Sequence, residues 1–165
     1  GHKISQGLYL GLTEAMTNTC HHAYPDTSPE IEWWVFSQVK DKALTVTICD
    51  LGVGIPKTLP STQPNRFKAL IRFYKEKLTD ANIIAGAIKK KKTRTNKSYR
   101  GKGLTQLANV IEQVDQLHND TCFFIYSGTG CYAKIKKEVR LTNYDTPTGG
   151  TIIAWKLPLI PNIEL

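Results

Sequence analysis

Apolar side chains near the start of the chain recur with the 3.6-residue period of an α-helix. Over residues 4–23, apolar and small side chains fall on one side of such a helix, and the polar groups of Glu14 and Asn18 fall on the other. Two prolines and several short polar residues occupy residues 24–29, and they disfavour continuation of the helix. The sequence therefore predicts an amphipathic helix that ends near residue 23.

A different pattern, short apolar or alternating runs bounded by turn residues, predicts five strands. These are residues 33–39, 43–49, 122–126, 132–136 and 151–157. We expect residues 40–42 to join the first two strands as a hairpin. Residues 128–130, Gly-Thr-Gly, are expected to turn between the next two. Pro158 is expected to stop the last strand.

Helical periodicity returns in residues 67–77, 80–88 and 103–117. The basic stretch 89–100 has no such period and is expected to be a mobile loop. The predicted helices are segregated from the predicted strands, which favours an α/β (α+β) two-layer sandwich of helices on a mixed, mostly antiparallel sheet. At 165 residues the chain is long enough for one core. We expect residues 1–165 to be a single domain excised from a longer protein.

Composition narrows the class of protein further. No apolar run approaches the roughly 20 residues that span a bilayer, so the expectation is a soluble, cytoplasmic protein. The formal charge of +8 is concentrated in residues 89–102 and suits a phosphorylated ligand, nucleic acid or an anionic surface. The 4 cysteines are scattered without a Cys-x-x-Cys pair, which favours buried thiols over a zinc site.

Glu14 and Asn18 stand four residues apart in the predicted first helix. This spacing puts a carboxylate and a carboxamide on the same helical face, where both can reach one ligand. A polar helical face that is merely solvated has the same pattern. The pair therefore carries weight only in combination with other motifs.

Asp50, Gly52 and Gly54 form an Asp-x-Gly-x-Gly sequence at the end of a predicted strand. A carboxylate in this position can accept a hydrogen bond from an exocyclic amine, and the glycines let a flat ring approach the backbone. An ordinary glycine-rich turn is the alternative.

Gly101, Lys102, Gly103 and Leu104 open a predicted helix directly after the basic stretch. The unpaired N–H groups and the dipole of a helix start attract anions. The segment is no Walker A loop, because residue 96 is Asn where that motif requires glycine. A glycine helix entry beside solvated lysines is again the alternative.

Gly149, Gly150 and Thr151 lead into the last predicted strand, which ends in Leu157-Pro158. Glycines followed by a hydroxyl residue indicate by themselves only a β-turn.

In this order, the four groups resemble the GHKL ATPase superfamily, whose members share a histidine-kinase-like ATP-binding domain. The resemblance covers about residues 12–158. Residues 12–23 are most similar to the branch of bacterial histidine kinases and anti-sigma kinases.

The resemblance implies a role for each matching residue. Asn18 would bind Mg²⁺ through its carboxamide oxygen, and Glu14 would orient or deprotonate a water or an acceptor group. Asp50 would accept from the adenine amine with help from Thr151, and Gly52 and Gly54 would shape the adenine slot.

The resemblance also assigns the phosphate contacts. They fall to Gly101, Lys102, Gly103 and Leu104, with Arg94, Lys97 and Arg100 as candidate cations from the loop. His22 is a candidate phosphate contact, whereas His118 is expected at the surface. The chain departs from the pattern at Thr105, where relatives often have a further glycine. We also expect these 165 residues to contain no second domain with a phosphoacceptor histidine.

Three functions remain open at this point. The first is an Mg-ATP-dependent catalytic domain that transfers the γ-phosphoryl group to a protein or hydrolyses ATP. The second is a non-hydrolysing ATP sensor that regulates a partner domain of the parent protein. The third is a nucleic-acid-binding module built on the basic stretch and Trp33-Trp34, which is disfavoured because tryptophans in strands pack more often in cores or interfaces.

Overall fold

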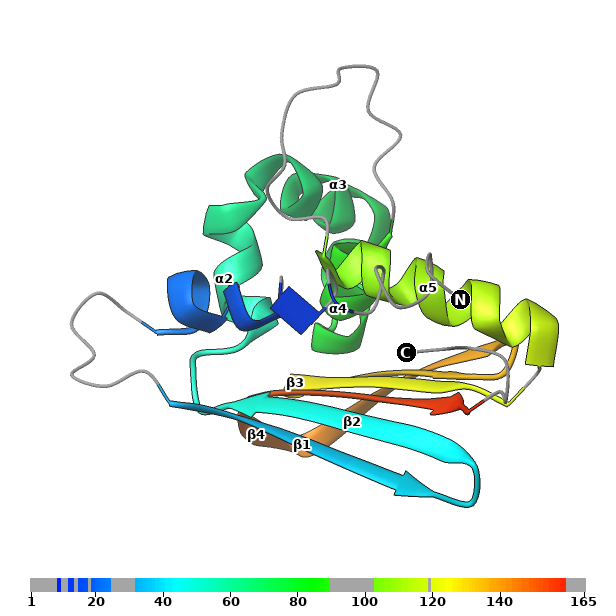
Figure 1. The fold of residues 1–165 in the computed structure, drawn as a ribbon. Helices are drawn as coiled ribbons and strands as arrows, with labels where there is room; N and C mark the ends of the chain where they lie inside the picture. The colour runs from blue at the N-terminus through cyan, green and yellow to red at the C-terminus, as the bar shows by residue number, and fades with distance from the viewer. Residues whose placement is uncertain are drawn as a thin grey trace, which may run out of the picture.

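The computed structural model describes residues 9, 12–13, 15–17, 19–24, 32–89, 103–118 and 120–159. Within this part of the chain, the helices lie over one face of a 4-stranded sheet with strand order β1-β2-β4-β3 (Figure 1). Every described strand pair is antiparallel. The predicted α+β two-layer sandwich is confirmed. The sheet was expected to be mixed and mostly antiparallel, and its described strands are all antiparallel.

Strands β1 (Trp33–Lys40) and β2 (Ala43–Asp50) form the predicted hairpin. Asp41 and Lys42 make the turn, and both have positive φ, 50° and 57°. Positive φ at both central residues is the geometry whose twist matches two antiparallel strands. The register pairs Trp33 with Asp50, so Asp50 stands at the last rung of the hairpin.

The second hairpin differs from its prediction. Strand β3 runs without a break over Cys122–Ile135, and β4 runs over Glu138–Pro158. The expected turn at residues 128–130 is wrong: the two glycines lie within β3, at register shifts where the strand bulges. Glycine marks a bulge as readily as a turn. The turn lies instead at residues 136–137, where Lys136 has a φ of 54°.

The chain forms helices before β1 and between β2 and β3. The described residues from Tyr9 to Thr17 are helical, and a π-helical turn, η1 (Thr19–Ala23), ends this stretch. Helices α4 (Asp80–Ile88) and α5 (Gly103–His118) confirm their predictions. The predicted helix at 67–77 is α3 (Pro64–Tyr74) followed by the 3-10 turn η2 (Lys75–Lys77).

Helix α2 (Ile55–Thr62) was not predicted from the sequence. Its two prolines, Pro56 and Pro60, argued against a helix in the sequence. Pro56, however, lies in the first turn of α2, where proline is well tolerated. The expected loop at residues 89–100 lies outside the described residues, except for Lys89.

The core lies between the inner face of the sheet and the helices α4 and α5. Alternate residues of the strands turn inward, as Ile48, Phe123 and Ile153 do, and they pack against residues such as Ile84 and Ile111. A smaller cluster joins α2, α3 and α4 through Leu59, Ile83, Ala87 and their neighbours. No helix in the described ranges is long and apolar enough to cross a membrane.

The cysteines only partly follow their prediction. Cys131 is buried, Cys49 and Cys122 are half-buried, and Cys20 is exposed. Burial was therefore wrongly predicted for Cys20, which lies in η1 between the buried residues Thr19 and Ala23.

Candidate functional site

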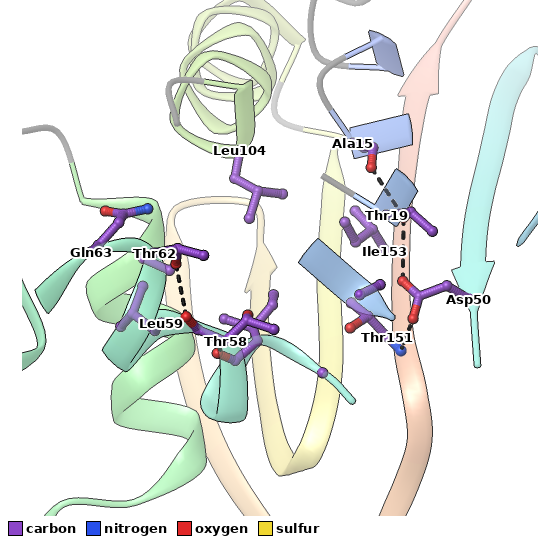
Figure 2. A pocket seen from close by; sticks show the side chains of 14 residues that line it. Ala15, Thr19, Asp50, Thr58, Leu59, Thr62, Gln63, Leu104, Thr151 and Ile153 are labelled. Atoms are coloured by element: carbon purple, nitrogen blue, oxygen red, sulfur yellow. Dashed lines mark hydrogen bonds between the residues drawn. The ribbon is translucent and has the colours of Figure 1, made fainter. Parts of the chain in front are cut away.

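A cavity of about 260 Å³ opens between the inner face of the sheet and the helices. Asp50 and Thr151 lie at one end of it, and Thr62 and Gln63 of the α2–α3 junction lie at the other (Figure 2). Apolar side chains, among them Leu104 of α5, line the space between these two ends. An apolar slot with a few polar groups at its ends is the usual form of a small-molecule site.

Asp50 ends β2 and is only 7% exposed. Its Oδ1 accepts hydrogen bonds from the backbone N–H of Gly52 (2.9 Å) and of Thr151 (3.2 Å). Burial raises the pKa of this carboxyl group above its ordinary value, while the hydrogen bonds from Gly52, Thr151 and Thr19 oppose that rise. The carboxyl group is thus held rigidly through one oxygen.

The second oxygen of Asp50 is less well satisfied. Oδ2 accepts from the Thr19 hydroxyl at 3.4 Å, but that hydroxyl also lies 3.1 Å from the Ala15 carbonyl oxygen. Thr19 has one hydroxyl proton and the Ala15 contact is the shorter. Among the described residues, Oδ2 therefore keeps acceptor capacity for a ligand in the cavity.

The glycines of the Asp50 loop are required by close backbone contacts. A Cβ at Gly52 would lie 2.2 Å from the carbonyl oxygen of Ala23, which also accepts the Val53 N–H at 2.7 Å. Gly54 has a φ of 85° and directly precedes α2. These contacts hold the loop against the end of η1 and start α2 along the cavity wall.

Thr151 faces Asp50 across the β2–β4 pair and is 6% exposed. It follows Gly150, whose φ is 135° and whose Cβ would lie 1.9 Å from the backbone oxygen of Asp50. The glycine allows the two strands to bring Thr151 to the carboxyl group. Asp50, Gly54, Thr151 and Leu104, which were predicted from three separate motifs, all line this one cavity.

Several residues that the sequence analysis assigned to the site are not among the described residues. Glu14, Asn18, Arg100, Gly101 and Lys102 lie outside the described residues, as do the side chains of His22 and His118. Gly103 begins α5, as expected for a helix entry. Ala15 and Thr19, which flank Asn18 in the sequence, line the cavity.

The sequence analysis missed several residues that line the cavity or that bond to its lining from behind. Thr58, Thr62 and Gln63 belong to the unpredicted α2 and its end. Ser127 is fully buried and bonded to Thr151. A signal for Ser127 did exist, because the alternation Phe123, Ile125, Ser127 puts a hydroxyl on the core face of β3.

Comparison with protein families agrees with this geometry. The family model described as the histidine kinase-like ATPase domain matches residues 2–121, which is most of the chain. The chain belongs to this family. Its function at the coarse level is therefore that of an ATP-binding domain with ATPase- or kinase-like character. The match ends before Thr151, so it does not cover the contribution of β4 to the cavity, which the structure shows through Thr151 and Ile153.

Proposed function

We propose that the domain binds Mg-ATP with the adenine ring in the cavity between Asp50 and Leu104, and that it uses ATP for phosphoryl transfer or hydrolysis. The observation that carries the proposal is the Asp50 carboxyl group, buried and fixed through Oδ1, with Oδ2 able to accept from the adenine amine. The apolar walls formed by Leu104 and Ile153 suit a flat aromatic base.

The phosphates would lie toward the start of α5. Gly101, Lys102, Gly103 and Leu104 would supply a helix start with unpaired N–H groups, and Arg100 would add a positive charge. Support comes from Leu104, which follows Gly103 at the start of α5 and lines the cavity.

Asn18 is the residue proposed to hold Mg²⁺, a hard ion that prefers oxygen ligands. The ion would neutralise phosphate charge when it is bound. Glu14 would orient or deprotonate the attacking water or acceptor group. Their neighbours Ala15 and Thr19 line the cavity, which supports placing this helix beside the nucleotide.

Competition between nucleotides tests the adenine assignment. ATP should bind about tenfold to a hundredfold more tightly than GTP, since guanine presents a carbonyl oxygen to the Asp50 carboxylate and leaves polar groups unmatched. Isothermal titration of the wild type and of Asp50→Ala measures the preference, which the variant should lose. Equal affinity of the wild type for ATP and GTP would refute the assignment.

Turnover then separates a catalytic domain from an ATP sensor. A catalytic domain should release phosphate, or transfer it to a partner, faster than the Glu14→Ala variant does, with ATP affinity little changed. Tight binding without turnover above the Glu14→Ala level would identify a sensor instead.

A further inference from the structure

Ser127 of β3 lies behind the cavity wall, where it bonds to residues of α2 and β4, and it is 0% exposed. Its Oγ accepts the backbone N–H of Ile55 (2.8 Å), the first residue of α2. The same Oγ lies 3.3 Å from the carbonyl oxygen of Gly150 and 3.0 Å from Oγ1 of Thr151. Among the described residues, Ser127 is the one whose side chain forms a hydrogen bond with the Thr151 hydroxyl.

The number of hydroxyl protons limits the hydrogen bonds that Ser127 and Thr151 can form. The Ile55 N–H uses one lone pair of Ser127 Oγ, and Ser127 has one proton to donate. If Ser127 donates to Gly150, then the Thr151 hydroxyl donates its proton to Ser127. In that case Thr151 Oγ1 can only accept a hydrogen bond from a ligand in the cavity. If Ser127 donates to Thr151, then the Thr151 proton is released toward the cavity.

The second arrangement matches the edge of adenine. Asp50 Oδ2 offers an acceptor for the exocyclic amine, and a donating Thr151 hydroxyl offers a proton to the adjacent ring nitrogen N1, directly or through a water. Switching between the arrangements gives up only the 3.3 Å contact to Gly150. A hydroxyl that receives a hydrogen bond also donates more strongly, because linked hydrogen bonds polarise one another.

We propose that Ser127 is a positioning residue that fixes the rotamer of Thr151 and directs its hydroxyl proton to N1 of a 6-aminopurine. This inference rests on the proposed function, since it assigns the base-recognition edge of the same site. Ser127 itself is too deeply buried to contact the base. It acts through Thr151, while Asp50 recognises the amine.

The test compares ATP with 1-deaza-ATP, in which a C–H group replaces N1. Isothermal titration of the wild type should give an affinity about fivefold to tenfold lower for 1-deaza-ATP, as expected for one lost hydrogen bond. In Ser127→Ala the ratio of the affinity for ATP to that for 1-deaza-ATP should fall below about twofold, and it should fall in the same way in Thr151→Val. A change of overall packing alone would weaken the binding of ATP and of 1-deaza-ATP equally and would leave the ratio of the two affinities unchanged.

Thr129→Ala is the matched control. Thr129 is a hydroxyl residue of the same bulged stretch of β3, but its Oγ1 donates to Asp80 (2.9 Å) at the start of α4 instead of bonding in the cavity. The ratio of ATP affinity to 1-deaza-ATP affinity in Thr129→Ala should equal that of the wild type. Ser127→Cys, which keeps a weak donor, should retain part of the discrimination.

The outcomes separate the two proposals. Failure of the wild type to bind ATP would refute the proposed function. ATP binding with an unchanged ratio in Ser127→Ala, or with a wild-type ratio near one, would refute only the role of Ser127. Thermal melting checks the fold of each variant. Loss of fold in both Ser127 variants, with Thr151→Val still folded, would show a structural role and would also overturn the inference.

Discussion

Asp50 destabilises the folded protein at neutral pH through its own burial. Desolvation raises the pKa of its carboxyl group, which means that the folded state holds the proton more tightly than the unfolded state does. Stability therefore falls as the pH rises from the ordinary Asp pKa, about 3.9, through the folded value. Such a cost agrees with the proposal that the free acceptor of Asp50 is kept for a ligand.

Asp50→Asn should accordingly stabilise the empty protein. The Asn Oδ1 can accept the same two N–H groups, from Gly52 and Thr151, and the amide has no charge to desolvate. We expect the variant to melt above the wild type at pH 7, by about 2–4 °C for each 1 kcal/mol of removed penalty. Melting curves from pH 4 to pH 8 measure the difference, which should shrink toward pH 4.

The same variant should bind ATP poorly, because an amide N–H then faces the adenine amine as a second donor. Thermal shift with and without ATP measures this loss. A variant that melts below the wild type at pH 7 would contradict the account of Asp50 given above.

Asn18→Ala should separate metal binding from base binding. We expect the variant to bind Mg-ATP at least about tenfold more weakly and to lose turnover, because in the proposed site Mg²⁺ would lose a protein oxygen ligand. Binding of adenosine without metal should change little, since Asp50 and Thr151 are untouched. Titrations with Mg-ATP and with adenosine measure the two effects, and equal losses of both would refute the metal assignment.

At the scale of elements, the cavity depends on strands and loops that approach each other backbone to backbone. Gly52 lies against η1, and Gly150 of β4 lies against the end of β2. Neither position has room for a Cβ. The Asp-x-Gly-x-Gly and Gly-Gly-Thr motifs thus fix how closely these elements pack.

Gly150→Ala and Gly149→Ala form a matched pair that tests this packing. Gly150 has a φ of 135°, and a Cβ there would lie 1.9 Å from the Asp50 backbone oxygen, whereas nothing lies within 4 Å of a Cβ at Gly149. We expect Gly150→Ala to cost about 2–4 kcal/mol of unfolding free energy, and Gly149→Ala to cost less than about 0.5 kcal/mol. Urea denaturation measures both, and similar costs would contradict the contact.

At the scale of the whole molecule, the helices connect the cavity to the basic stretch 89–100. Arg66 of α3 donates to the carbonyl oxygens of Ala87 (2.7 Å) and Lys89 (2.9 Å), so α3 holds the end of α4. Ala87 also lines the cavity. The basic stretch therefore starts from a fixed point beside the candidate site.

Proteolysis tests whether the basic stretch responds to nucleotide. The segment is rich in like charges and poor in apolar residues, so we expect trypsin to cleave there first in the empty protein. Phosphate groups would relieve the repulsion, and Mg-ATP should slow the cleavage about tenfold, while adenosine should not. Gel analysis followed by mass spectrometry locates the cuts, and unchanged rates with Mg-ATP would argue against a role in phosphate binding.

The sequence by itself determined the class of fold, the first hairpin, the helices α4 and α5, and the residues Asp50, Gly54, Leu104 and Thr151 that meet in the cavity. The class of fold, the hairpin and the helices follow from local physics, namely the period of apolar residues and the turn residues. The four site residues were singled out because their motifs, taken in order, resemble those of the GHKL superfamily. Local signals also misled, because glycines mark both bulges and turns, as at residues 128–130, and prolines can start a helix, as in α2.

Only the tertiary structure decided how these motifs combine. The pairing of Asp50 with Thr151, 101 residues apart along the chain, depends on β2 and β4 being neighbours in the sheet. The place of Ser127 behind Thr151, and the two N–H groups that leave one Asp50 oxygen with acceptor capacity, depend on the same packing. Contacts between distant segments form only when the whole core excludes water, so no local pattern in the sequence encodes them.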